Sequence, residues 1–357
     1  MVNGIFTIPL GSPSGAPLEV DGAASGRFGE FIAGPENRLA ACALRPYMDR
    51  SANHLSPLVL YGPHGAGKSH LARGLTAWWE RRYPKARALC LTGAEFARAH
   101  ADALSADRLD AWRASLAALD LLVLEDLGQM VSKRGAQQEL LLLLDDLADR
   151  QALVVVTCRS LPARLVGLLP ALRSRLTGGT AVPVALPEAA TRRALLEKVA
   201  TLRRLALDRK TIHALADGLS TSVPSLVSAL LELELKSRLD GSTVDRTRAR
   251  QLAAARAAAK MPPLGEIAKR TAKYFGLTLA DLKSPARRQP LVAGRGVAMY
   301  LARKLTNKSF DEIGAYFGGR DHTTVLHAVR KIEDLSGSDN TLAQELELLR
   351  RLINDQA

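Results

Sequence analysis

The stretch PLVLYGPHGAGKSHLARGL, residues 57–75, determines the class of fold. It contains the spacing G-x-x-x-x-G-K-S at Gly62, Gly67, Lys68 and Ser69, between an apolar run and an amphipathic one. In this context backbone N–H groups turn toward phosphates, the lysine reaches the β and γ phosphates, and the serine hydroxyl ligates Mg²⁺. The motif therefore predicts a nucleoside triphosphate site with Mg²⁺, and a chance glycine-rich turn is the alternative.

On both sides of this motif, short apolar runs alternate with longer amphipathic stretches. The runs PLVLYG, ARALCLT, DLLVLED and ALVVVT follow one another between about residue 27 and residue 186. Such alternation is typical of βα units around a parallel sheet. The sequence therefore predicts an α/β P-loop core.

Charged residues stand at two positions where a nucleotide-binding core needs them. DLLVLED ends in Glu125 and Asp126, which we expect beside the magnesium ion, although a capping or solvated pair is the alternative. LRSRL carries Arg173 and Arg175, either of which is a surface cation or a finger that reaches the γ-phosphate of a neighbouring subunit. The catalytic candidates are Glu125, Asp126 and one of these two arginines, and the metal-ligand candidates are Ser69, Glu125 and Asp126.

Shifts in composition divide the chain into segments. The start is rich in Gly, Pro, Ser and Ala, whereas Leu and Ala recur at helical spacing after Pro187 and again after the break at Met261-Pro262-Pro263. The predicted segments are a flexible leader at 1–26, a nucleotide-binding core at 27–186, a helical lid at 187–246, a connector helix and break at 247–263, and a DNA-binding domain at 264–357.

The stretch SFDEIGAYFGGRDHTTVLHAVRKIE, residues 309–333, predicts two helices joined by a Gly-Gly-Arg turn. In helix-turn-helix geometry the first turn of the second helix enters the major groove of DNA. Asp321, His322, Thr323 and Thr324 lie on that turn, so they are able to meet base edges. For Asp321 the alternative is a helix N-cap without a base contact.

The charge of the chain favours a polyanionic partner. The formal net charge is +13, and residues 264–331 hold 13 Lys or Arg against 5 Asp or Glu. Arg287 and Arg288 lie in the Pro-flanked loop SPARRQP, which suits insertion into a minor groove, with a solvated basic loop as the alternative. The predicted contacts to double-stranded DNA are Arg287, Arg288, Arg295, Lys304, Thr306, Arg320, Asp321, His322, Thr323 and Thr324.

Composition excludes several other classes of protein. Apolar residues make up 47% and charged residues 24% of the chain, as in soluble globular proteins. The three cysteines are widely spaced, which argues against a disulfide framework or a zinc site. No apolar run approaches the roughly 20 residues of a membrane span, and no secretion signal is apparent. These features predict a cytoplasmic protein.

From about Arg27 to its end, the chain resembles the bacterial chromosomal replication initiator family DnaA. FIAGPENRLA, the P-loop, DLLVLED, LRSRL, AMYLARKLTNKSFDEIGAYFGG and GRDHTTVLHA occur in the order of that family. The resemblance implies an AAA+ core with a helical lid, followed by an all-α helix-turn-helix domain. It also implies that Arg175 is the arginine finger and that Asn37 lies near the nucleotide base. The predicted ATP-binding residues are Asn37, Gly62, Gly65, Gly67, Lys68 and Ser69.

The sequence departs from the family pattern in four places. Glu125-Asp126 replaces two aspartates, and VTCRS places Cys158 and Arg159 where the family has an aspartate as its first sensor. SVPSLVSAL places Pro224 at the second-sensor arginine, for which Arg192 and Arg193 of the lid are candidate substitutes. About 26 residues precede the core, where the family has an N-terminal domain that contacts the helicase. We therefore expect ATP to bind but to be hydrolysed slowly, and helicase recruitment stays open.

The favoured function is an ATP-dependent initiator of chromosomal replication. It would bind specific duplex boxes at an origin, assemble into an ATP-bound oligomer, open the duplex, and hold single-stranded DNA in the ATPase oligomer. One alternative is a regulatory paralogue that binds the same boxes without productive hydrolysis. A helicase loader or transposition-helper ATPase is less favoured, because such proteins do not need the C-terminal reading helix.

Overall fold

The structure, a computed structural model, describes residues 5–10, 30–52, 56–205, 207–240, 245–259, 261–286 and 288–354. The chain forms two compact units, Met1–Arg250 and Gln251–Ala357. The division between them falls inside α10 (Arg246–Ala259). Among the described residues, no helix combines the length and the apolar character that crossing a bilayer requires.

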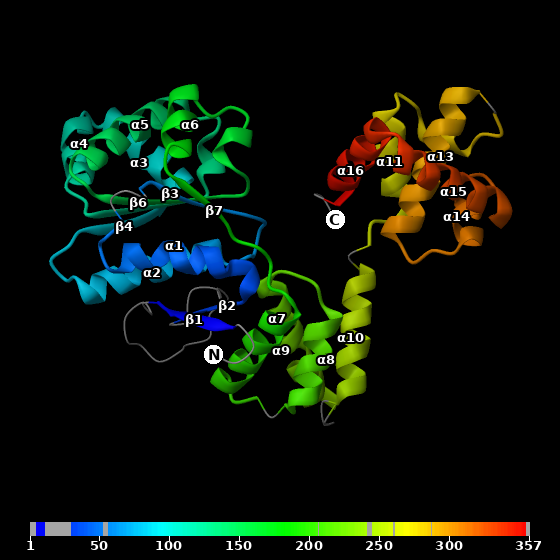
Figure 1. The fold of residues 1–357 in the computed structure, drawn as a ribbon, viewed down its shortest axis with the longest axis horizontal. Helices are drawn as coiled ribbons and strands as arrows, with labels where there is room; N and C mark the ends of the chain where they lie inside the picture. The colour runs from blue at the N-terminus through cyan, green and yellow to red at the C-terminus, as the bar shows by residue number, and fades with distance from the viewer. Residues whose placement is uncertain are drawn as a thin grey trace. The chain divides into compact units, whose positions relative to one another are not determined.

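The first unit is built on a five-stranded parallel sheet in the order β4-β5-β6-β3-β7 (Figure 1). The sheet confirms the predicted α/β core. Its strands are β3 (Leu58–Tyr61), β4 (Ala88–Thr92), β5 (Leu121–Glu125), β6 (Leu153–Cys158) and β7 (Thr180–Pro183).

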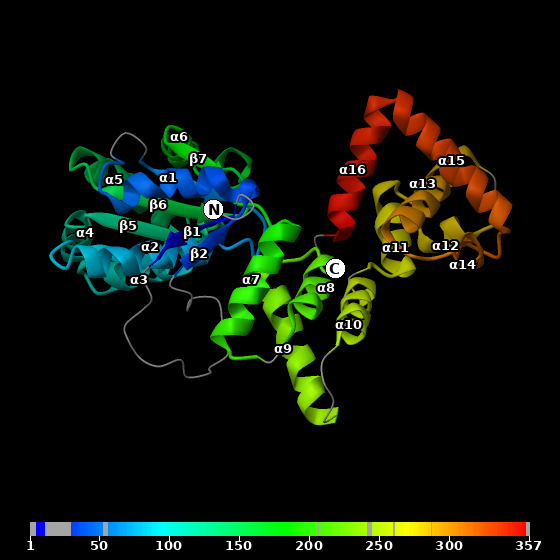
Figure 2. The same ribbon diagram turned by 60° about the horizontal axis from the view of Figure 1, so that its bottom comes forward.

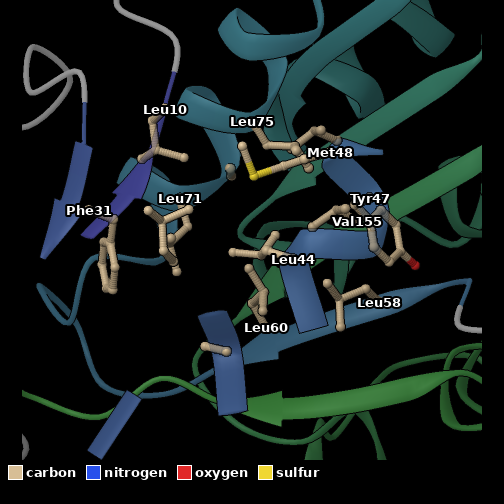
Figure 3. Packing of buried hydrophobic residues seen from close by; sticks show 14 of the residues in the cluster. Leu10, Phe31, Leu44, Tyr47, Met48, Leu58, Leu60, Leu71, Leu75 and Val155 are labelled. Atoms are coloured by element: carbon tan, nitrogen blue, oxygen red, sulfur yellow. The ribbon is translucent and has the colours of Figure 1, made fainter. Parts of the chain in front are cut away.

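Helices cover both faces of this sheet, which is why the strands are apolar on both sides. Along β3, Leu58 and Leu60 pack in one cluster with α1 and α2, while Val59 packs in the cluster on the other face (Figure 3). The helices on the first face are α1 (Arg38–Met48) and α2 (Lys68–Arg82). Those on the second face are α3 (Gly93–Ser105), α4 (Leu109–Ala117), α5 (Arg134–Asp149) and α6 (Pro170–Thr177).

Part of the predicted flexible leader is ordered, so that prediction is wrong for β1 (Phe6–Pro9). This strand pairs antiparallel with β2 (Glu30–Ala33). Ile8 and Leu10 are buried, and Leu10 packs so closely on α2 that a Cβ on Gly74 would lie 2.5 Å from its side chain. The alternation of Phe6, Ile8 and Leu10 was the signal for a strand. Residues 11–26 of the predicted leader lie outside the described residues.

A group of three helices follows the sheet, over the segment predicted to be the lid, and is called the lid below. The helices are α7 (Ala189–Leu202), α8 (Arg209–Gly218) and α9 (Val223–Asp240), and Figure 2 shows them beside one another. Pro187 and Glu188 separate the lid from the segment that follows β7.

In the described residues of the second unit, all regular secondary structure is helical, as the sequence predicts. Its core is formed by residues such as Ile313, Phe317, Val325, Val329 and Ile332, which join the helix-turn-helix to the rest of the unit. The helices are α11 (Leu264–Tyr274), α12 (Leu279–Lys283), α13 (Gln289–Leu305), α14 (Phe310–Tyr316), α15 (His322–Ser338) and α16 (Asn340–Asn354).

Candidate functional site

The phosphate loop joins β3 to α2 and depends on its glycines. Gly62, Gly65 and Gly67 have positive φ angles of 155°, 71° and 104°. A Cβ on Gly62 would lie 2.0 Å from the carbonyl oxygen of Val184, and one on Gly67 would lie 2.7 Å from the ring of Phe31. Side chains other than hydrogen are therefore excluded at these two positions.

Lys68 begins α2, directly after this loop. Its Nζ donates to the carbonyl oxygens of Gly62 at 2.7 Å and Pro63 at 2.8 Å, which fixes the ammonium group over the loop. Burial lowers the pKa of Lys68, and the positive charge of Arg159 lowers it further, while Asp126 acts in the opposite direction. The lysine thus shares its surroundings with one acidic and one basic side chain.

A cavity of about 600 Å³ opens at the carboxyl ends of the strands, between the phosphate loop and the lid. In α/β folds, ligands usually bind at the carboxyl ends of the parallel strands, where the loops lead into the N-termini of the following helices. Of the predicted nucleotide and metal residues, those lining the cavity are Asn37, Gly65, Gly67, Lys68, Ser69 and Asp126. Gly62, Glu125 and Arg175 are not among its lining residues.

The lid contacts the phosphate loop directly. The N–H of Val223, the first residue of α9, donates to the carbonyl oxygen of Gly65 at 3.1 Å. Pro224 lines the cavity, and a Cβ on Gly65 would lie 3.3 Å from its ring. The residue at the family's second-sensor position therefore lies beside the phosphate loop but offers no side-chain donor.

The predicted acidic pair separates at the end of β5. Glu125 is 3% exposed, and its Oε1 accepts from Arg73 Nε at 2.6 Å and from Cys90 Sγ at 3.5 Å. Asp126 instead lines the cavity, and its N–H donates to Thr157 Oγ1 at 2.9 Å. Of the two, Asp126 is the one placed to act on a bound nucleotide.

Arg73 is a residue that sequence reasoning missed. Arg73 lies on α2, five residues after Lys68. No sequence motif marks it as the partner of Glu125, which ends strand β5. Its charge holds Glu125 in place, and burial, followed by the charge of Glu125, raises the pKa of Cys90 to about 12. The thiol of Cys90 is accordingly inert near neutral pH.

The cavity fits ATP with Mg²⁺. Its volume suits a nucleotide-sized ligand, and its phosphate end carries Lys68 and the loop amides. Ser69 and Asp126 supply a hydroxyl and a carboxylate, the oxygen ligands with which Mg²⁺ joins substrate phosphates and water. Within the described part of the chain, His, Cys, Asp and Glu form no metal-binding group of three or more, so phosphates and water would complete the shell.

Asn37 reaches the cavity but its amide is already paired. Its Nδ2 donates to the carbonyl oxygen of Ala185 at 3.1 Å, and its Oδ1 accepts from the N–H of Ala185 at 2.8 Å. The side chain is 2% exposed. Asn37 therefore holds the segment after β7 in place. Because both polar groups of its amide are used in this way, any contribution to base binding comes from packing.

The lid arginines proposed as substitutes for the second sensor are engaged elsewhere. Arg192 donates to the carbonyl oxygens of Ala216 at 2.8 Å and Pro187 at 2.9 Å and is 8% exposed. Arg193 pairs with Asp217 at 2.7 Å. Neither lines the cavity, so the structure contradicts this suggestion.

Arg175 lies apart from the nucleotide cavity of its own chain. Its Nη2 is 2.9 Å from Asp145 Oδ1, and its side chain is 38% exposed. It lines a second cavity, of about 830 Å³, beside α5 and α6. Arg173 is instead held by the carbonyl oxygens of Leu165 and Leu168, at 3.3 and 3.2 Å. Both arginines are half-buried, and Arg175 is the one whose partner is an acidic side chain on another helix.

In the second unit, the first turn of α15 presents polar residues to solvent. Asp321 is the N-cap, and its Oδ1 accepts from the N–H of Thr324 and from Thr323 Oγ1, both at 2.7 Å. These hydrogen bonds lower the pKa of Asp321 to about 2. Asp321, His322, Thr323 and Thr324 are all exposed. Asp321 is therefore a helix N-cap, and the Thr323 hydroxyl already donates to it. Base contacts by Asp321, His322, Thr323 and Thr324 stay a prediction.

The turn before α15 brings two backbones together. The N–H of Arg320 donates to the carbonyl oxygen of Gly314 at 2.9 Å, and a Cβ on Gly314 would lie 2.0 Å from the carbonyl oxygen of Arg320. Gly318 and Gly319 adopt φ angles of 95° and 71°. These glycines fix the angle at which α15 leaves α14.

The predicted basic contacts divide into buried and exposed residues. Arg295 is 5% exposed, and all three of its side-chain nitrogens donate to backbone carbonyls, so the prediction that it contacts DNA is wrong. Its position on the inner face of α13 explains the error. Arg288 and Lys304 are exposed, although Lys304 pairs with Glu333 at 2.6 Å. Arg287 lies outside the described residues.

Two further predicted contacts have structural roles. Thr306 Oγ1 donates to the carbonyl oxygen of Ala302 at 2.6 Å at the end of α13. Arg320 Nη2 donates to the carbonyl oxygen of Ser284 at 2.7 Å and is half-buried. Thr306 and Arg320 therefore already hold backbone carbonyls of the domain. Any contact that they make to DNA would be in addition to these hydrogen bonds.

Comparison with known proteins gives matches to both units. Residues 24–183 match the family model of the bacterial DnaA ATPase domain, and residues 264–332 match that of the bacterial DnaA helix-turn-helix. The chromosomal replication initiator protein DnaA of Mesorhizobium japonicum is 38% identical over 339 residues, which cover 92% of this chain and 69% of that protein. The protein of the same name from Cereibacter sphaeroides is 32% identical, with 95% of this chain and 75% of that protein covered.

A solved structure agrees with these matches. Replication initiator DnaA bound to AMPPCP and single-stranded DNA superposes with a TM-score of 0.57 at 25% sequence identity, covering 91% of this chain and 96% of that chain. AMPPCP is an analogue of ATP, so that structure holds an ATP analogue together with single-stranded DNA.

Proposed function

The chain belongs to the DnaA family of bacterial chromosomal replication initiators, and on that premise we propose that it is an ATP-dependent initiator. It binds specific duplex boxes at an origin and assembles cooperatively to open DNA. The observation that carries this proposal is the presence, in one chain, of a phosphate-loop cavity and of an exposed polar turn at the start of α15.

Each unit has a separate task in this proposal. The second unit reads the box through His322 and Thr323, while Arg288 and Lys304 meet phosphates. The first unit binds ATP and Mg²⁺ with Lys68, Ser69 and Asp126. Single-stranded DNA, which the similar solved protein holds, is a second partner that we propose for the assembled ATPase units.

Arg175 connects nucleotide state with assembly. It is half-exposed and does not line the nucleotide cavity of its own chain. We propose that it leaves Asp145 and reaches the γ-phosphate of ATP in a neighbouring subunit. Cooperative assembly then requires ATP in one subunit and this arginine in the next.

The test is a footprint of the full chain on candidate origin DNA, with ATP, with ADP and without nucleotide. We expect single boxes to be protected in all three conditions, and extended protection with duplex opening only in ATP. Permanganate reactivity of unpaired thymines measures the opening, and Lys68→Ala is the control that binds DNA without nucleotide. Protection that ignores sequence at matched salt would refute the initiator assignment.

One observation favours a second candidate, a regulatory paralogue that binds the same boxes without productive hydrolysis. Pro224 occupies the cavity where the family has its second-sensor arginine. Stabilisation of the transferring phosphate is thereby reduced. Extended protection in ATP without permanganate-reactive thymines would favour this paralogue over the initiator.

A further inference from the structure

The lid leaves the phosphate end of the cavity short of positive charge. Among the described lid residues that line the cavity, the single cation is Lys198, and it forms an ion pair with Glu30 of β2. Pro224 supplies no charge, and Arg192 and Arg193 are bound elsewhere. A triphosphate held by the loop would therefore meet no free cation from the lid.

Arg159 supplies a positive charge from the opposite side. It follows β6 directly, and β6 lies next to β3 in the sheet. The N–H of Gly62 donates to the carbonyl oxygen of Cys158 at 3.2 Å, so the backbone before Arg159 is joined to the start of the phosphate loop. Arg159 lines the same cavity as Lys68 and Asp126.

The guanidinium of Arg159 has no competing partner in the described part of the chain. Arg159 is exposed, and among the described residues neither a hydrogen bond nor an ion pair engages its side chain. Arg159 and Lys68 line the same cavity, and the positive charge of Arg159 lowers the pKa of Lys68. Like charges that share a cavity repel, and an anion bound between them relieves that repulsion.

From this arrangement we infer that Arg159 binds the terminal phosphate of ATP in its own subunit, in place of the lid cation that Pro224 does not provide. The inference rests on the proposed ATP-dependent function. Lys68 reaches the β and γ phosphates from the loop, and the planar guanidinium adds a bidentate donor from the end of β6. Arg159, which belongs to the nucleotide-binding core and not to the lid, then makes the main distinction between ATP and ADP, whatever the position of the lid.

The experiment measures equilibrium affinity of the full chain for ATP and for ADP, each with Mg²⁺, by titration calorimetry. Arg159→Ala should weaken ATP binding roughly tenfold or more, because a charge-assisted hydrogen bond is lost, and should change ADP binding much less. Arg159→Lys should retain part of the preference for ATP. Arg164→Ala is the matched control, since Arg164 is an exposed arginine nearby in the chain that does not line the cavity.

A second variant gives an independent readout. Pro224→Arg introduced into Arg159→Ala should restore the preference for ATP, because it returns a cation to the same cavity from the lid. Circular dichroism of each variant establishes that the fold is retained, which we expect because both residues are exposed.

Each outcome separates this inference from the function on which it rests. Unchanged affinities in Arg159→Ala, or equal weakening of ATP and ADP, would overturn the role of Arg159 while leaving the ATP site intact. A wild-type chain that binds neither nucleotide would overturn the ATP-dependent function, and the inference with it. In that case Lys68→Ala would match the wild type, whereas it should abolish binding if the site is real.

Discussion

Replacing Arg295 by methionine should destabilise the second unit without removing a DNA contact. In the structure Arg295 Nε donates to the carbonyl oxygen of Leu282 at 2.7 Å, and its two terminal nitrogens donate to those of Asp281, Ser284 and Ala286. The guanidinium thereby ties α13 to α12 and to the start of the following loop. Methionine keeps most of the apolar stem but none of these donors.

The size of the effect follows from which carbonyls lose their partners. Ser284 keeps a hydrogen bond from Arg320, and Asp281 keeps those from the N–H and hydroxyl of Ser284. Among the described residues, Arg295 is the sole donor to Leu282 and Ala286 beyond the helices' own bonds. An unsatisfied buried carbonyl costs about 1–3 kcal/mol, so we expect a loss of about 2–4 kcal/mol in the free energy of unfolding, given that Ala286 is only half-buried.

Amide hydrogen exchange of α13 and α15 in the full chain measures this loss. A change of about 2 kcal/mol corresponds to roughly thirtyfold faster exchange of the slowest amides. Arg288→Ala, at an exposed arginine that caps the same helix, is the control and should leave exchange nearly unaltered. Two results together would refute this reasoning: unaltered exchange in Arg295→Met, and a slope of log DNA affinity against log salt concentration that is lower by about 1. They would show that Arg295 contacts a DNA phosphate after all.

Three further outcomes are expected. Thr323→Ala should lower affinity for a box by about 1–3 kcal/mol and leave affinity for random DNA nearly unaltered, as a competition assay at matched salt would show; equal losses on both DNAs would contradict it. Arg175→Ala should keep ATP and single-box binding but lose oligomers in sedimentation with ATP, and oligomers of wild-type size would argue against the trans contact. Single-turnover hydrolysis should be far slower than the typical enzyme rate of about 10 per second. Pro224→Arg should raise that rate, so a variant with improved affinity and an unaltered rate would exclude the missing cation as the cause.

Much of the fold was predictable because its key patterns are local. The phosphate loop needs glycines at fixed spacing between a strand and a helix, and the observed φ angles of Gly62, Gly65 and Gly67 are those that only glycine adopts readily. The helix-turn-helix is equally local, since Gly314 and the glycine pair at 318–319 lie within a few residues of α15. Both predictions are confirmed by the family matches.

The errors came from contacts that depend on how the elements pack, whether the partners lie 9–14 residues apart, as for Arg295, or 52 residues apart, as for Arg73 and Glu125. Arg295 and Arg288 are alike in sequence, but one faces the interior of the unit and the other faces solvent. Glu125 and Asp126 are adjacent, and the position of Arg73 on α2, beside the end of β5, separates their roles. Composition and spacing do not carry this information, because it depends on which elements pack together.

The ion pair between Arg73 and Glu125 couples the substitutions that evolution can accept at these two positions. A change of Arg73 to an uncharged residue leaves a carboxylate that is 3% exposed without its cation. A change of Glu125 alone leaves an arginine whose side chain is 57% exposed, so water solvates its charge. Loss of Arg73 is therefore the costly first step while Glu125 is present. Lineages that carry glutamate at the end of β5 should carry a basic residue at the position of Arg73, and those that return to aspartate should lose it.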